Sequence, residues 1–240
     1  MRGPLQRPVV SYLRKISKNV PIARAGGSLF AGFDSGRCAR ELSDDGYSMG
    51  FSLPVELIDE IRQFHAGANS DNILNPHKEC RALDAIAHDP GVVDVARRYF
   101  GVEPVLYATR LYYASPRTRA EIEEVYANER KVHFDVTDFM DLALFIYLTD
   151  IDEDTSPHIV VRGTHKRKTI MDLINQRYTV KTALERFPDR FRAVIGPAGM
   201  AFFEDTSVFH IQGLGTRGRL MAVCGYTMHR SPYLSRYAVP

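Results

Sequence analysis

The six residues Lys131–Val136, which read KVHFDV, decide how the rest of the chain is interpreted. Their apolar and β-branched character predicts a strand over Val132–Val136, in which successive side chains point to opposite faces. His133 and Asp135 would share one face, while Phe134 would point away from them and pack. A second strand-like run, Ser207–Gln212, carries another histidine, His210.

Two histidines and one carboxylate are the ligands of a facial triad, which holds ferrous iron and leaves coordination positions open. Sequence spacing alone does not bring His133, Asp135 and His210 together, and the chain contains 8 histidines. A structural histidine with one core hydrogen bond is therefore the alternative interpretation of the His-x-Asp pair.

Arg219 follows His210 after a short glycine-rich turn and begins the strand-like run Arg219–Met228. An arginine that faced the same interior would be a costly buried cation unless it bound a carboxylate. Its planar guanidinium suits bidentate binding of a carboxylate on a ligand. Two alternatives stay open: Arg219 is an exposed strand residue, or Arg217, which has the same parity, is the arginine that points inward.

The composition indicates an ordinary globular protein of 240 residues, with 45% hydrophobic and 25% charged residues and a net charge of +2. So small an excess does not indicate nucleic-acid binding. The three cysteines form no CxxC pair, which fits a reducing compartment, and no apolar run reaches the ~20 residues that span a bilayer. We therefore expect a cytoplasmic protein without a transmembrane segment; its oligomeric state is not predicted.

Residues 1–30 are predicted to be a loosely structured lead-in with a short helix near residues 12–17, before one domain over residues 31–240. A helix ends at Asp45-Gly46, and another is expected after Ser52, taken as its N-cap, through His65. A further helical region covers about residues 78–100. Short strands dominate the remainder, apart from a helical insert over about residues 166–196. This order predicts an α+β protein whose strands form a sandwich or barrel. The expected strands are 105–114, 132–136, 142–149, 158–162, 200–203, 207–212 and 219–228.

From about residue 40 to 228 the ordered motifs resemble the phytanoyl-CoA dioxygenase-like family. The run Leu142–Lys166 ends in IVVRGTHK, which is similar to the Pro-Gly-Ser/Thr-His-Lys signature of that family. GMAFF at residues 199–203, then His210 and Arg219, follow in the family's order. Two departures, Arg162 in place of the usual Pro and Ser156-Pro157-His158 in place of a glycine-rich turn, concern the shape of a loop only.

The resemblance implies a double-stranded β-helix, a cupin-like jelly roll with flanking N-terminal helices, that uses Fe(II) and the cosubstrate 2-oxoglutarate. His133, Asp135 and His210 would hold the iron, and Arg219 would bind the distal carboxylate of 2-oxoglutarate. Three further residues would lie at the cosubstrate: Tyr112, Phe145 and Gln212.

The implied activity is an O2-dependent hydroxylation of an unactivated C–H bond, with succinate and CO2 as coproducts. Asp135 stands where halogenating relatives carry a small residue, which favours hydroxylation. Polar residues expected at the barrel mouth indicate a small-molecule substrate that is polar or carrier-linked: Arg110, Tyr112, His158, Arg162 and His165. The alternatives are a non-catalytic jelly-roll binding protein and a cupin-type metal enzyme that does not use 2-oxoglutarate.

Overall fold

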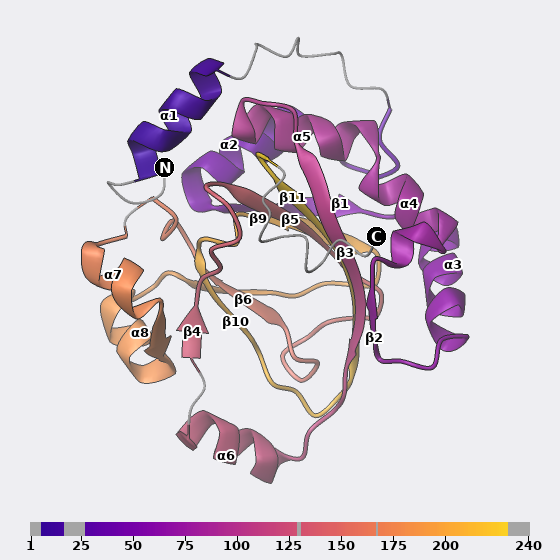
Figure 1. Ribbon diagram of the computed structural model, residues 1–240. Helices are drawn as coiled ribbons and strands as arrows, with labels where there is room; N and C mark the ends of the chain where they lie inside the picture. The colour runs from indigo at the N-terminus through magenta and orange to yellow at the C-terminus, as the bar shows by residue number, and fades with distance from the viewer. Residues whose placement is uncertain (1–5, 17–26, 129–130, 167, 230–240) are drawn as a thin grey trace.

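The computed structural model describes residues 6–16, 27–128, 131–166 and 168–229. Its strands form two antiparallel sheets that face each other (Figure 1). The six-stranded sheet has the order β1-β9-β5-β11-β3-β2, and the five-stranded sheet has the order β7-β4-β10-β6-β8. The first sheet contains β1 (Tyr47–Ser52), β2 (Asn72–Leu74), β3 (Val105–Ala114), β5 (Asp141–Tyr147), β9 (Met200–Glu204) and β11 (Arg219–Thr227). The second contains β4 (Lys131–His133), β6 (His158–Val161), β7 (Arg177–Thr179), β8 (Phe191–Val194) and β10 (Phe209–Gln212).

The order of these strands is that of the double-stranded β-helix predicted from the sequence. Strands distant in the chain alternate within each sheet, so that β11 pairs with both β3 and β5, and β10 pairs with both β4 and β6. A second apolar cluster lies between the sheets and includes Phe145, Tyr147, Phe202 and Met221. This inner space is where the inward-pointing side chains of the two sheets meet.

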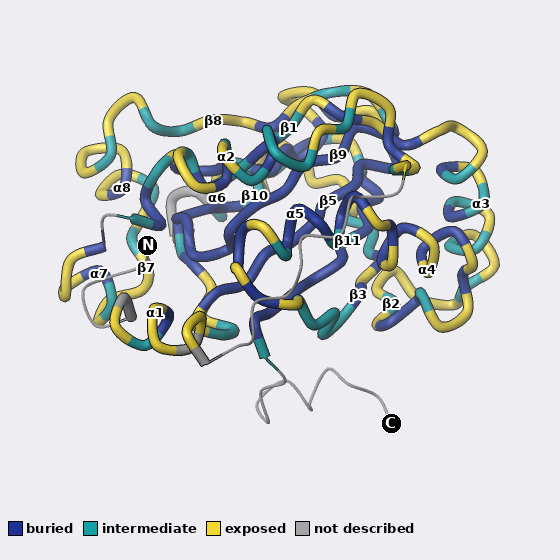
Figure 2. Tube along the Cα trace, turned by 90° about the horizontal axis from the view of Figure 1, so that it is seen from above, coloured by how far each residue is buried: buried dark blue, intermediate teal, exposed yellow. Residues whose placement is uncertain are grey.

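Helices cover the outer face of the six-stranded sheet (Figure 1). They are α2 (Ser35–Asp45), α3 (Val55–Ala66), the short 3-10 turn Pro76–Lys78, α4 (Arg81–Ala87) and α5 (Pro90–Phe100). Their apolar faces bury Leu42, Ile61 and Phe100 in one core with outward-facing strand residues such as Leu144 and Ala222. Figure 2 shows this burial along the central strands and the inner sides of the helices. The helix α1 (Gln6–Ile16) joins the same core through Val10.

The link from α2 to β1 follows the expected Asp-Gly pattern. Gly46 is the C-cap of α2, with a φ of 84°, and its N–H donates to the carbonyl of Leu42. A Cβ on Gly46 would lie 2.3 Å from Val208 Cγ1 and 2.7 Å from His165 Nδ1. Glycine is therefore required here both for the left-handed backbone and for the close approach of the helix to the second sheet.

Residues 168–194 and α6 (Arg119–Asn128) lie on the other side of the molecule (Figure 1). The helices α7 (Ile170–Asn175) and α8 (Val180–Arg186) flank β7 next to the five-stranded sheet. A third apolar cluster forms there, in which Phe134 packs edge-on against Phe209 with ring centroids 5.1 Å apart. Phe134 is thus a packing residue, as the alternation of side chains around it predicts.

Three local expectations are wrong. Ser52 is the last residue of β1 and not an N-cap; Pro54 occupies that position before α3, with no side-chain hydrogen bond. The strand β4 ends at His133, earlier than expected. The backbone N–H of Asp135 donates at 2.9 Å to the carbonyl of Thr206, which lies outside the sheet, so this N–H does not extend the ladder. The strand β10 begins at Phe209, later than expected, because Asp205 closes a turn by accepting from the backbone N–H of Ser207.

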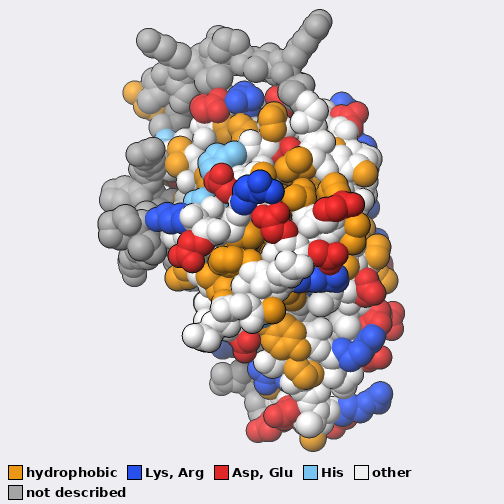
Figure 3. Space-filling view, turned by 90° about the vertical axis from the view of Figure 1, so that its right-hand side faces the viewer, with side chains coloured by type: hydrophobic (Ala, Val, Ile, Leu, Met, Phe, Trp, Pro, Cys, Tyr) orange, Lys and Arg blue, Asp and Glu red, His pale blue; other side chains and the backbone are white. Residues whose placement is uncertain are grey.

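The structure also shows the state of the cysteines and the distribution of surface charge. Cys38, Cys80 and Cys224 are free and buried. The face in Figure 3 shows acidic and basic side chains interspersed, and neighbouring residues on α3 and α4 form pairs such as Arg62 with Asp59 at 3.2 Å. Within the described ranges, no helix is both long enough and apolar enough to cross a membrane.

Candidate active site

The register of β4 and β10 brings two histidines side by side. His133 and His210 are direct partners across this antiparallel pair, and their ring centroids lie 4.6 Å apart. The neighbours of the two histidines on these strands, Val132 and Phe209, point to the opposite face and pack in the third apolar cluster. Both imidazoles therefore face the space between the sheets.

Asp135 completes a three-residue cluster, although it follows β4 and does not belong to it. Its Oδ1 lies 3.9 Å from Nε2 of His133, and its Oδ2 lies 3.7 Å from Nε2 of His210. One ligand atom from each of the three side chains lies within 4.8 Å of the others. In the part of the chain that the structure describes, no other group of three or more His, Cys, Asp or Glu side chains meets this condition.

Backbone carbonyls fix which nitrogen of each imidazole faces Asp135. Nδ1 of His133 lies 3.2 Å from the carbonyl of Lys131, and Nδ1 of His210 lies 3.1 Å from the carbonyl of Val208. A carbonyl can only accept, so each Nδ1 carries the hydrogen and each Nε2 presents a lone pair toward the carboxylate. This is the arrangement that prepares a histidine to bind a metal ion.

A buried acid and a buried imidazole lie behind His210. Oε2 of Glu204 and Nε2 of His158 are 2.6 Å apart, and the other oxygen, Oε1, lies 3.2 Å from Nδ1 of His210 without a hydrogen bond. Burial raises the pKa of Glu204 to about 8 and lowers the pKa of His158 to about 3. Both groups are therefore uncharged at neutral pH, and the O–H of the carboxylic acid donates a hydrogen bond to Nε2 of His158.

Arg219 is the inward-pointing arginine. Its side chain is 0% exposed; Nη1 donates to the carbonyl of Ser156 at 2.5 Å and Nη2 to the hydroxyl of Tyr112 at 3.2 Å. Its Nε is buried without a partner, and no carboxylate of the described residues lies within ion-pair distance. Arg217, the alternative, is instead exposed and forms an ion pair with Asp152. Arg219 is thus a fully buried cation that lacks the anion expected beside it.

The other predicted cosubstrate residues lie around one large cavity. Tyr112, Phe145 and Gln212 line a cavity of about 1020 Å³ together with Asp135. Phe145 is held by stacking on Phe202, with centroids 4.9 Å apart. The cavity is at the upper end of the range for small-molecule sites, roughly 300–1,000 Å³.

The expected barrel-mouth group is only partly correct. Arg110 and Tyr112 line the cavity, whereas the other three candidates do not. His158 is buried against Glu204, and His165 is buried with its Nε2 3.2 Å from the carbonyl of Ser43. Arg162 lies on the surface, 3.5 Å from Asp45. The expectation for these three residues was wrong because the alternation of side chains along a strand does not show which end of the strand lies at the cavity.

Glu204 is the site residue that the sequence did not reveal. It ends the apolar run Met200–Glu204, all five residues of which are buried. Its position in a strand two residues after the inward-facing Phe202 is the available signal, because side chains two apart share a face. Its partner His158 is 46 positions earlier in the chain, and no local pattern connects the two.

Comparisons with known proteins agree with the fold. No family model and no curated protein matches the chain, so membership of the phytanoyl-CoA dioxygenase-like family stays a prediction. Solved structures match this chain over most of its length. The epimerase SnoN from nogalamycin biosynthesis, in complex with Fe3+, alpha ketoglutarate and nogalamycin RO, has 16% identity and a TM-score of 0.64, covering 86% of this chain and 90% of its own.

Two further structures give the same result. The carbocyclase SnoK, described as non-heme and alpha ketoglutarate dependent, has 18% identity and a TM-score of 0.63, covering 90% of this chain and 95% of its own. EctD from S. alaskensis, solved with 2-oxoglutarate and 5-hydroxyectoine, has 16% identity and a TM-score of 0.59, covering 88% of this chain and 82% of its own. The chain therefore has the double-stranded β-helix fold of non-haem iron, 2-oxoglutarate-dependent enzymes.

Proposed function

We propose that this chain is an Fe(II)- and 2-oxoglutarate-dependent oxygenase, with residues 31–240 as its catalytic domain. The observation that carries the proposal is Arg219, a buried guanidinium without a carboxylate, in a fold that also gathers His133, Asp135 and His210. A non-catalytic binding protein needs neither feature, and a cupin-type metal enzyme that does not use 2-oxoglutarate needs no carboxylate clamp. The two features together support the oxygenase.

The three clustered side chains fit a divalent iron. His133 and His210 would bind through Nε2, because each Nδ1–H is held by a backbone carbonyl, and Asp135 would bind through a carboxylate oxygen. Two neutral imidazoles and one carboxylate are the ligand set of non-haem ferrous sites, and they leave positions for other ligands. The ring of His158, stacked on that of His210 with centroids 5.5 Å apart, would support the imidazole from one side.

Arg219 fits the distal carboxylate of 2-oxoglutarate. The Nε of Arg219 has no partner, and its two amino groups are held in place by hydrogen bonds, so the guanidinium can bind a carboxylate oxygen through Nε. The hydroxyl of Tyr112 lies beside it. Phe145 and Gln212 would line the remainder of the cosubstrate site, since both face the same cavity. Burial strengthens the attraction, because the guanidinium is shielded from water.

We infer that the reaction is hydroxylation of an unactivated C–H bond in a small, polar or carrier-linked substrate, with succinate and CO2 as coproducts. When bound, iron and 2-oxoglutarate supply the oxidising chemistry from O2, and the residues of this chain bind, orient and exclude water. Asp135 supports hydroxylation over halogenation, because its carboxylate takes the coordination position that a halide would need.

The test is anaerobic titration of the Fe(II)-loaded protein with 2-oxoglutarate. A weak visible charge-transfer band is expected for the wild type and for Arg217→Met, which removes a surface cation. Arg219→Met should lose the band at the same concentrations, and Asp135→Ala should lose Fe(II) binding. Absence of the band in the wild type would contradict the proposal. Product analysis on an identified substrate would then separate hydroxylation from the epimerisation and cyclisation named for SnoN and SnoK.

A further inference from the structure

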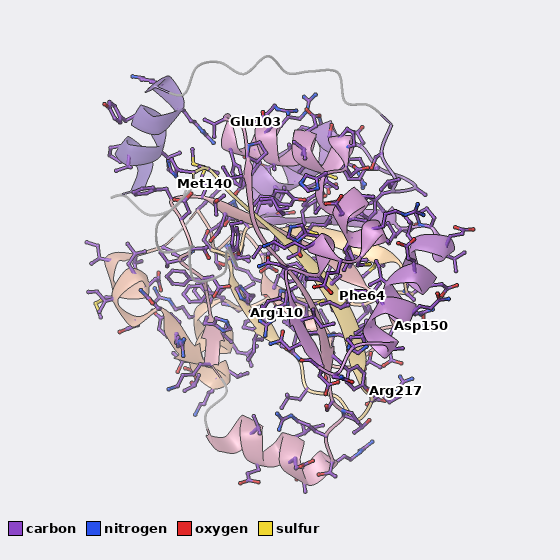
Figure 4. The ribbon with its side chains drawn as sticks, turned by 45° about the vertical axis from the view of Figure 1, so that its right-hand side comes forward. Phe64, Glu103, Arg110, Met140, Asp150 and Arg217 are labelled. Atoms are coloured by element: carbon purple, nitrogen blue, oxygen red, sulfur yellow. The ribbon has the colours of Figure 1, made fainter. Side chains whose placement is uncertain are left out.

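Arg110 points from β3 into the cavity that Tyr112, Phe145 and Gln212 line. It is the cross-strand partner of Val223 on β11 and of Leu74 on the edge strand β2, and all three residues line the cavity. Arg110 is exposed there, whereas Arg219 is completely buried. Figure 4 shows Arg110 toward the middle of the molecule and Arg217, a surface arginine, at its edge.

The guanidinium of Arg110 is fixed in place without being neutralised. Its Nε donates to Oδ1 of Asn72 at 2.6 Å, and its Cζ lies 5.2 Å from the centre of the Tyr112 ring. No carboxylate among the described residues lies within ion-pair distance of it. One edge of the guanidinium is thus tied down by an amide and a ring, and its amino groups remain available to a ligand. An arginine held in this way is pre-organised for an oxyanion.

Two cations and two carboxylates line the cavity, and they differ in how they are paired. Its charged lining residues are Arg110, Arg117, Asp135 and Glu121. Asp135 belongs to the proposed metal site. The carboxylate of Glu121 accepts from the backbone N–H and the hydroxyl of Thr118 at 2.7 Å and 2.8 Å, at the start of α6. The formal charges of these four side chains sum to zero, but no described carboxylate lies within ion-pair distance of Arg110, so its guanidinium is open to an anion.

The cavity also has room for the body of a ligand next to Arg110. Three cross-strand neighbours on β3, β11 and β5 are the small residues Ala108, Gly225 and Ala143, and all three line the cavity. The ring of Tyr107 covers Gly225, where a Cβ would come within 2.6 Å of it, so the ring forms a wall of the cavity between Ala108 and Ala143. This row of small residues adjoins the row of Phe145, Val223 and Arg110, so a ligand anchored at Arg110 can extend across it.

We propose that Arg110 binds an oxyanion, a carboxylate or phosphate group, on the substrate that this oxygenase oxidises. The substrate is thus anionic, with a body that packs against the ring of Tyr107 beside Ala108 and Ala143, in the cavity that Asp135 also lines. This assignment rests on the proposed function. It gives Arg110 a role distinct from that of Arg219: the buried arginine holds the cosubstrate, and the arginine that is open to solvent selects the substrate.

The test uses the Fe(II)- and 2-oxoglutarate-loaded protein under anaerobic conditions. Calorimetry would measure the binding of benzoate, phenyl phosphate and the neutral analogue benzamide to the wild type, Arg110→Met, Arg110→Lys and Arg217→Met. We expect at least one anionic probe to bind the wild type and Arg217→Met, and to bind Arg110→Met at least ~10-fold more weakly. Arg110→Lys should recover part of that loss, and benzamide should not distinguish the variants.

Preference for benzoate or for phenyl phosphate would tell which oxyanion the substrate carries. Equal binding of the anions to the wild type and Arg110→Met would overturn the assignment, as would the failure of both anions to bind the wild type. A weaker 2-oxoglutarate titration in Arg110→Met would also overturn it, by assigning Arg110 to the cosubstrate. Loss of the charge-transfer band in the wild type contradicts the oxygenase itself, so the two failures have different readouts.

Discussion

Replacing Arg219 by methionine tests whether this residue serves ligand binding or the stability of the fold. In the ligand-free protein Arg219 is a buried cation with two hydrogen bonds, two aromatic neighbours and no carboxylate. The two bonds contribute ~1.5–3 kcal/mol each, while burial of an unpaired charge costs several kcal/mol. These terms nearly cancel. We therefore expect Arg219→Met to change the free energy of unfolding by no more than about 2 kcal/mol in either direction.

Arg98→Met is the matched control. Arg98 donates through Nε to Oδ2 of Asp94 at 2.6 Å, and the side chain of Asp94 is 0% exposed. Removing Arg98 leaves a buried carboxylate with the hydroxyl of Ser35 and the distant Arg97 as its remaining partners. We expect a loss of about 3 kcal/mol, which is ~6–12 °C in Tm for a chain of this size.

The assay is thermal unfolding of the metal-loaded proteins under anaerobic conditions, with and without 2-oxoglutarate. A ligand at 100 times its Kd stabilises by ~2.7 kcal/mol, so the wild type and Arg98→Met should both gain roughly 5–10 °C. Arg219→Met should gain no more than about 1–2 °C, because loss of the clamp weakens binding at least ~100-fold. If Arg219→Met unfolds as readily as Arg98→Met and is still stabilised by 2-oxoglutarate, Arg219 is a structural residue and does not bind the cosubstrate.

Three further predictions concern the metal ligand, a titrating histidine and a glycine. Asp135→Ala should abolish Fe(II) binding but change stability by less than ~1 kcal/mol, because its side chain is 48% exposed; metal titration and urea unfolding check this. Burial lowers the pKa of His165 to about 4, so stability should be complete above about pH 6.5 and should fall by ~3 kcal/mol as the pH drops to 4; His165→Gln should reduce that slope in urea unfolding, and an unchanged slope would contradict it. Gly46→Ala should cost ~2–4 kcal/mol through its left-handed backbone and the contact with Val208, whereas Gly27→Ala, with open space around it, should have no effect on the urea midpoint.

Much of the candidate site could be predicted from the sequence because its residues lie in recognisable local patterns. The His-x-Asp pair, the later His210 and the arginine after a glycine-rich turn form an ordered set, and the structure brings the first three together. Alternation also placed Phe134 in the packing layer. The helices on the first sheet were visible from their apolar periodicity and from the Asp-Gly end of α2.

The remainder depends on contacts that no local pattern encodes. Strand β4 ends before Asp135 because a backbone bond to Thr206 draws the chain out of the sheet, which strand propensity cannot anticipate. The pairing of Glu204 with His158 joins strands of different sheets. The choice between Arg217 and Arg219 depends on where β11 begins. Alternation cannot decide it, because residues two apart in a strand share a face. Recognition of Arg110 as a free cation in a cavity requires its neighbours to be known.

The brevity of β4 has a consequence for how the molecule opens. His133 sits on a strand of three residues whose ladder with β10 contains the single pair His133 and His210. An ion held by both imidazoles would act as a cross-link between segments far apart in the chain, much as a disulfide closes a loop. Without the ion, β4 is joined to β10 by this one residue pair, although it also pairs with β7 over three residues. We expect hydrogen exchange at Val132 and Asp135 to slow markedly on loading with metal, while exchange in β11 stays unchanged.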